Sequence, residues 1–203
     1  LGLAFDQPND EVCWEEVGQI RYLSISTDAG AISLEDLSDE EGLTGNLYDF
    51  ALEDGISPTI FYGLHTLVWN TPTDVTMYEL YELRGLRSLT LASAYTTEDL
   101  QVFAVLPALE MLDIGGPDIT SLEGIESLPR LKSLALRDTS VASLAPLAGV
   151  EPSALTLEEN EVLVMLSPLA ELSSLQSLSI TKQDMMDFQF ITELPLLTEL
   201  TIR

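Results

Sequence analysis

Apolar residues recur in a fixed pattern from position 64 to the end of the chain. A Leu is followed three residues later by a second Leu, and two residues after that by Leu or Ile. The clearest copies begin at Leu86, Leu109, Leu131, Leu175 and Leu197. Successive copies are 22 or 23 residues apart, with one step of 21. Self-similarity at this period predicts a solenoid, in which stacked copies share one core.

The copy at 109–130 shows what each repeat is expected to form. Leu112 and Ile114 alternate with polar residues, which predicts a short strand. Gly-Gly-Pro at 115–117 ends that strand. Apolar residues then recur at every third position, at Ile119, Leu122, Ile125 and Leu128. This spacing predicts a 3₁₀ or irregular helical return. Stacked at ~4.8 Å per strand, the copies would enclose a continuous Leu-rich core.

One return segment, 97–106, has the signals of an α-helix. Thr97 is placed as its cap, Glu98 and Asp99 fall in its first turn, and Pro107 follows its end. Similar placements elsewhere suggest that many acidic residues complement helix N-termini.

The same spacing extends towards the N-terminus. Leu67 precedes Leu89 by 22 residues, Leu23 precedes Leu67 by 44, and Leu1 precedes Leu23 by 22. A further, degenerate copy is expected around Gly45. We therefore predict an α/β solenoid with about ten parallel strands on one curved sheet and short helical or irregular return segments. Residues 1–203 are expected to form a single domain, with degenerate repeats over 1–63 and regular repeats over 64–203.

These residues resemble the leucine-rich repeat family, and in particular the 22-residue class of bacterial internalin-like surface proteins. That family places an Asn three residues after the last strand Leu, where its side chain satisfies backbone groups of the turn. Asn160 alone matches this position. The equivalent positions elsewhere hold Asp28, Phe50, Pro72, Ala94, Pro117, Thr139 and Gln183. The resemblance implies a binding scaffold that uses its concave sheet, with no enzymatic activity.

Composition narrows the range of partners. The chain has 34 acidic residues against 8 Lys and Arg, a net charge of -26. Nucleic acids and anionic lipids need clustered bases, so neither is expected as a partner. This charge favours solubility and cationic partners or divalent ions. No apolar run reaches the ~18 residues of a membrane helix, so no membrane insertion is expected.

Residue types that carry catalysis are scarce. Cys13 and His65 are the single residues of their kinds and lie 52 positions apart, so neither a Cys–His pair nor a zinc site is expected. The glycines form no phosphate loop, and the acidic runs lack calcium-loop spacing. We expect no catalytic residue, no metal site and no cofactor.

The outward positions of the predicted sheet are small and mostly hydroxylated, but bases lie beside them. The candidate ligand-binding residues are His65, Arg87, Lys132, Arg137 and Lys182. They predict a strip that binds an anionic or hydroxyl-rich ligand. The alternative is that the bases offset acids on the same sheet, namely Glu110, Asp113, Asp138, Glu158 and Glu159.

Together these features predict a non-enzymatic module that binds a protein or glycan, from an extracellular or cell-surface bacterial protein. The alternative is a structural spacer within a larger protein. Both ends of the chain, at 1–3 and 200–202, read as strands without a polar cap. Solenoids need capped ends, so we expect either further residues beyond them or end-to-end self-association.

Overall fold

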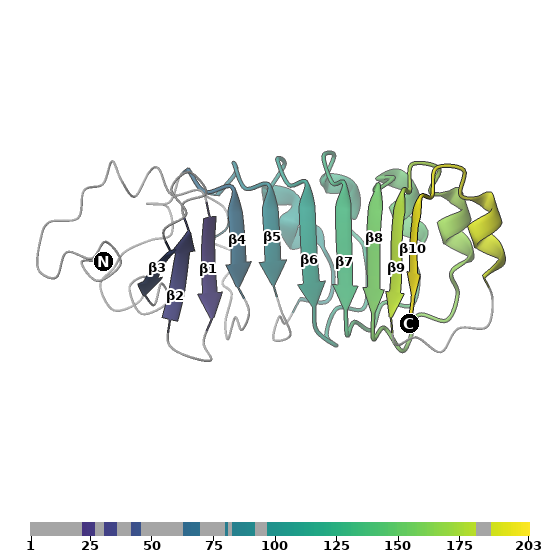
Figure 1. Cartoon of the computed structure of the whole chain (residues 1–203), viewed down its shortest axis with the longest axis horizontal. Coiled ribbons are helices and arrows are strands. Elements are labelled where there is room, and N and C mark those ends of the chain that lie inside the picture. Colours follow the sequence, from purple (N-terminus) through teal and green to yellow (C-terminus); the bar gives the residue numbers. More distant parts are fainter. Residues whose placement is uncertain are drawn as a thin grey trace, which may run out of the picture.

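The protein is built on one ten-stranded sheet, with the return segments of the repeats on one side of it (Figure 1). The computed structural model describes residues 22–26, 31–35, 42–45, 63–69, 80, 83–91, 97–181 and 188–203. For the first three ranges and for Trp69, it describes the backbone alone. The predicted first strand at 1–3 lies outside the described residues.

The strands and 3₁₀ helices alternate from β5 onwards, as one repeat follows another. The elements are β1 (Tyr22–Ser26), β2 (Ala31–Glu35), β3 (Gly42–Gly45), β4 (Thr66–Trp69), β5 (Ser88–Leu91), η3 (Gln101–Val105), β6 (Met111–Gly115), η4 (Ile125–Ser127), β7 (Ser133–Arg137), η5 (Ala145–Gly149), β8 (Ala154–Glu158), η6 (Ser167–Glu171), β9 (Ser177–Thr181), η7 (Gln189–Glu193) and β10 (Glu199–Ile202). Strands β4–β10 are the seven parallel strands of the regular solenoid. The predicted solenoid of stacked repeats is therefore confirmed.

The predicted number of about ten parallel strands is an overcount. β1 does pair with β4 in parallel, with Leu23 next to Leu67. β2 and β3 instead pair antiparallel, β2 with β1 and β3 with β2. The copy expected around Gly45 is thus not a parallel repeat between β1 and β4. The 44 residues from Leu23 to Leu67 span one step of the sheet, because the chain between them returns through an antiparallel excursion.

The core consists of the inward residues of the strands together with the apolar residues of the return segments. Leu89, Leu112 and Leu134 lie in one register across β5, β6 and β7, and all three are fully buried. The apolar series that recurs every third residue after Ile114 is buried throughout. In β5–β9, each inward Leu is shielded from water by its counterparts in the repeats on either side, so burial depends on stacking.

The return segments are 3₁₀ helices, as the spacing of three predicts. The α-helix predicted over 97–106 is wrong, because the segment forms the five-residue 3₁₀ helix η3. Leu100 occupies its N-cap position, and no side chain caps it. Thr97 donates its hydroxyl to the Asp99 carbonyl, and Asp99 accepts from the Gln101 amide. In the described ranges there are five 3₁₀ helices, η3–η7, and among these only η4 has an acidic residue in its first turn. Acids therefore do not generally complement these helix starts.

At one position, a glycine is required because two backbone segments approach each other closely. Gly124 precedes η4 with φ of +95°, a conformation that L residues rarely adopt. A Cβ at this position would lie 2.8 Å from the carbonyl carbon of Leu100 and 2.5 Å from the Cα of Gln101. The preceding residue accepts a hydrogen bond at 2.9 Å from the Leu100 amide. Gly124 therefore lets η3 and η4 stack at backbone distance.

Replacing this glycine should destabilise the stack. We expect Gly124→Ala to lower the free energy of unfolding by about 2–4 kcal/mol, because it combines a left-handed φ with overpacking. Gly149→Ala is the matched control, since a Cβ there meets nothing within 4 Å. It should change stability by no more than about 1 kcal/mol. Urea unfolding of both variants measures the difference, and equal values would contradict the proposed role of Gly124.

Candidate functional site

The outward face of the sheet is the side away from the return segments. Its two columns of side chains have the register that the sequence predicts across β5–β10. The first column is Ser88, Met111, Ser133, Ala154, Ser177 and Glu199, and the second is Thr90, Asp113, Ala135, Thr156, Ser179 and Thr201. Most of these side chains are small, so the backbone of the sheet lies close to the surface. Met111, 46% exposed, is the one large apolar residue among the twelve.

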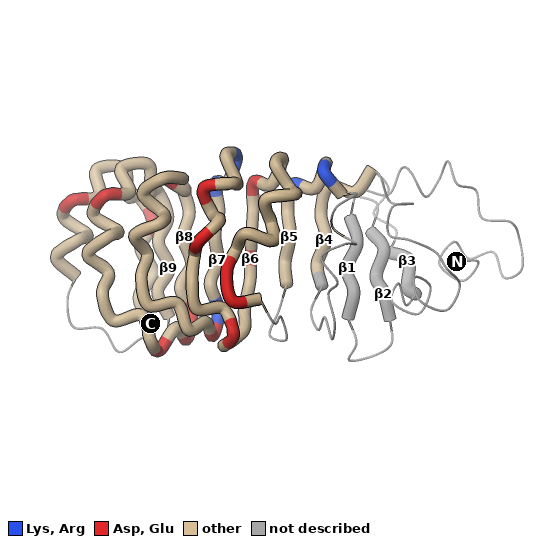
Figure 2. Tube along the Cα trace, turned by 180° about the vertical axis from the view of Figure 1, so that it is seen from behind, with Lys and Arg blue, Asp and Glu red and all other residues tan. Residues whose placement is uncertain are grey.

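Basic residues gather at the strand-start edge, which is the row of residues just before β4–β7 (Figure 2). Arg87 precedes β5, Glu110 precedes β6 and Lys132 precedes β7, and backbone hydrogen bonds connect these neighbours in turn. Lys132 Nζ lies 2.6 Å from Glu110 Oε2. This hydrogen bond, more than the nearby charges of Arg87 and Arg130, lowers the pKa of Glu110 below its ordinary value. The edge is thus a row of bases around one acid.

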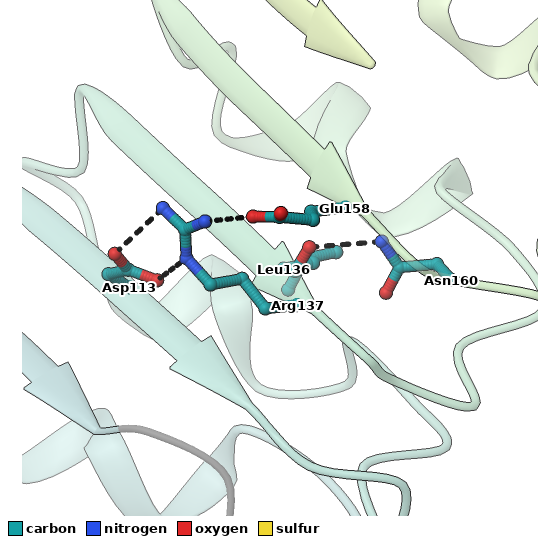
Figure 3. A network of polar contacts seen from close by, with 5 residues as sticks. All are labelled: Asp113, Leu136, Arg137, Glu158 and Asn160. Atoms are coloured by element: carbon teal, nitrogen blue, oxygen red, sulfur yellow. Dashed lines mark hydrogen bonds and ion pairs between the residues drawn. The ribbon is translucent and has the colours of Figure 1, made fainter. Parts of the chain in front are cut away.

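A second charged cluster lies where the strands end (Figure 3). Arg137 Nε is 2.8 Å from Asp113 Oδ1, and the same guanidinium pairs with Glu158 on the other side. The neighbour of Arg137 on β6 is Gly115, which has no side chain, so the guanidinium can reach diagonally to Asp113. Its hydrogen bond with Asp113 raises the pKa of Arg137. One base therefore ties three adjacent strands together.

The five predicted binding residues fall into different places. His65, Arg87 and Lys132 belong to the strand-start edge, whereas Arg137 lies at the opposite end of its strand. Lys182 lies outside the described residues. Lys132 and Arg137 pair with acids named in the charge-compensation alternative. Ligand binding by this set stays a prediction.

Sequence reasoning missed Arg130 as a member of the strand-start edge. It lies in the turn two residues before Lys132 and is exposed, yet its charge acts on Glu110. The signal was its position directly before the first Leu of a repeat, which places it next to the row of residues that precede the strands.

A buried amide fixes the turn that follows β8 (Figure 3). Asn160 is 1% exposed, and its Nδ2 donates to the Leu136 carbonyl at 2.9 Å. Its Oδ1 accepts from the Thr139 amide at 3.0 Å and from the Thr139 hydroxyl. The implied role of this Asn, to satisfy backbone groups of a turn, is confirmed. It joins the β8 repeat to the preceding one.

No helix in the described ranges is long and apolar enough to cross a membrane. The same part of the chain contains no group of three or more His, Cys, Asp and Glu residues arranged to hold a metal ion.

Parallel strands in register, 3₁₀ returns and a Leu-filled interior define a leucine-rich repeat solenoid. No protein-family model and no curated protein matches the sequence. Among solved structures, internalin C2 of Listeria monocytogenes is similar over 100% of this chain and 82% of its own, with a TM-score of 0.64 and 21% identity. The predicted structural resemblance to internalins is thus confirmed. At this identity the likeness establishes the fold alone.

Two other Listeria monocytogenes structures show the same likeness. Internalin InlF matches with a TM-score of 0.56 and 18% identity, over 95% of this chain and 63% of its own. The functional domain of InlJ, which includes a cysteine ladder, matches with a TM-score of 0.56 and 16% identity. That match covers 73% of this chain and 36% of the InlJ chain. The chain thus spans less than two thirds of either protein.

Breaking the Lys132–Glu110 pair should raise the pKa of Glu110 towards its ordinary value. Lys132→Met removes both the hydrogen bond and the charge that lower this pKa. Arg130→Met is the control and should cause a smaller rise, because Arg130 acts through its charge alone. A carboxyl NMR titration of each variant measures the shift. A larger rise in Arg130→Met would show that the hydrogen bond is not the main cause.

Loss of the buried amide should be costly. Asn160→Ala leaves the Leu136 carbonyl and the Thr139 amide without the partner they now have. We expect a loss of about 2–4 kcal/mol in unfolding free energy, because two buried polar groups are affected. Thr139→Ala removes one side-chain hydrogen bond and should cost less. Chemical denaturation of both variants tests this order.

Proposed function

We propose that the chain is a non-enzymatic interaction module whose outward sheet face binds a polar partner, either a protein or a glycan. We place it in an extracellular or cell-surface bacterial protein. The observation that carries the proposal is a broad sheet face of small and hydroxylated side chains with bases along the strand-start edge. Ser133, Thr156 and Ser177 are partly exposed on it. Such a face suits hydrogen bonding to a hydroxyl-rich or anionic surface more than burial of large apolar groups.

The internalin-like fold supports this proposal, because a solenoid presents an extended surface rather than a closed pocket. We also propose that the chain has no catalytic activity of its own. The charged clusters on the face are ion pairs between neighbouring repeats, and in the described residues none of them joins a nucleophile to a general base.

One observation favours the second candidate, a structural spacer. Binding hot spots are enriched in Trp, Tyr and Arg. The outward columns of β5–β10 contain none of these, and Arg137 beside them is held between two acids. In the spacer role, the only task of such a face is to keep a long, acidic stack soluble while the stack presents another domain.

Charge reversal separates the two candidates. The chain is applied to an array of neutral, sulfated and uronate oligosaccharides, and bound species are compared between variants. If the strand-start edge recognises anionic ligands, Arg87→Glu and Lys132→Glu should each weaken capture by about tenfold, because each turns an attraction into a repulsion.

Arg203→Glu is the matched control. It makes the same change in net charge, but at the far end of the sheet after β10. Equal capture by all three variants would refute the recognition strip. If no oligosaccharide is captured, a protein remains as the candidate ligand. The same result would favour the spacer.

A further inference from the structure

A stretch of four residues after β8 exposes three apolar side chains. Val162 is 49% exposed, Val164 74% and Met165 63%, whereas Leu163 between them is buried in the core. We name these three exposed residues the turn patch. They lie on the turn and return segment, away from the outward sheet face. Most other large apolar residues of the described repeats are buried, so three exposed neighbours in one turn are not scattered surface residues.

The two preceding repeats do not share this feature. The buried residues Ile119, Val141 and Leu163 mark the same position in three successive repeats. The two residues that follow each of them are Thr120 and Ser121, then Ala142 and Ser143, and finally Val164 and Met165. The solenoid therefore tolerates small or hydroxylated residues at these positions. Packing of the core does not explain the valine and the methionine.

The turn patch is held on a fixed backbone. Leu163 follows Leu157 by six residues, one more than the step from Leu136 to Val141, so this turn contains one additional residue. The Leu163 amide donates to the Asn160 carbonyl at 3.0 Å, which closes a turn around Glu161 and Val162. The buried side chain of Asn160 joins this turn to the preceding repeat. A partner would thus meet a preorganised surface, which limits the entropy lost on binding.

The surroundings of the turn patch are acidic. Glu159 and Glu161 precede it, and Asp138 occupies the place of Glu159 in the neighbouring repeat, with a similar positive φ. A second copy of a chain with a net charge of -26 would be repelled from this rim. A cationic partner would be attracted.

We propose that the turn patch is a docking site for an amphipathic, cationic segment of a partner protein. Apolar side chains of that segment cover Val164 and Met165, and its Lys or Arg side chains face Glu161. This surface is separate from the outward sheet face, so the proposal does not depend on what that face binds.

Binding of short synthetic peptides to the whole chain tests the proposal. A helical Leu/Lys peptide, a Ser/Lys peptide of equal charge and a Leu/Glu peptide are titrated by fluorescence anisotropy. The Leu/Lys peptide should bind, and the other two should bind at least tenfold more weakly. The double variant Val164→Thr, Met165→Ser carries residue types that earlier repeats hold at these positions, and should lower affinity for the Leu/Lys peptide about tenfold or more. Glu161→Gln should weaken binding and reduce its salt dependence.

Met111→Ser is the matched control, because it removes an exposed apolar side chain from the outward sheet face. It should leave binding of the Leu/Lys peptide unchanged. Thermal melts should be the same for all variants, since each substituted side chain is exposed.

Several results would overturn the proposal. One is no binding of the Leu/Lys peptide, and another is equal binding of the Ser/Lys peptide, which would mean attraction by charge alone. A third is undiminished binding to the double variant. Sedimentation velocity without peptide gives the fourth: self-association that the double variant abolishes would identify a second copy as the occupant.

Discussion

Burial of one inward leucine by its counterparts in adjacent repeats is the interaction on which the structure depends. Leu112 is fully buried because Leu89 and Leu134 lie beside it in register. Complete burial of such a side chain is worth about 1.5–3 kcal/mol. No single repeat obtains this alone, because its strand and its 3₁₀ return make an open loop. Cohesion is therefore a property of neighbouring pairs of repeats, and close backbone contacts such as that at Gly124 are needed to bring the pairs together.

Polar contacts between repeats also join nearest neighbours. Asn160 reaches back to the preceding repeat, and Arg137 joins β6, β7 and β8 through Asp113 and Glu158. In a chain with a net charge of -26, Arg137 lies between two acids of neighbouring strands and offsets the repulsion between them. These surface pairs are individually weak, so their main effect is to permit the register that the leucines impose.

The sequence predicts the regular part of this fold well, because leucine spacing sets strand register, outward columns and 3₁₀ returns together. It does not predict β2 and β3. The 44 residues from Leu23 to Leu67 fit two repeats as well as one repeat with an antiparallel excursion, since a residue count does not specify pairing. The prediction of an α-helix at 97–106 was wrong for a related reason. The capping signals in this segment suit an α-helix and a 3₁₀ helix equally, whereas the close approach of η4 accompanies the tighter 3₁₀ helix. At the candidate site, the sequence placed acids and bases on one sheet. Which of them pair depends on side-chain reach, as the diagonal contact of Arg137 with Asp113 shows.

A solenoid separates the residues that build it from those that are free to vary. Inward positions are fixed by packing, so information about partners is confined to the outward columns, the strand edges and the turns. The outward columns use small side chains, which cost nothing to leave in water. Val164 differs, because it is 74% exposed and most of its apolar surface therefore stays in water. The preceding repeats fold with Thr120 and Ala142 at the same place, so folding does not require this residue. The proposed docking site would give this residue contacts with a molecule outside the chain, and Glu161 nearby favours a cationic one.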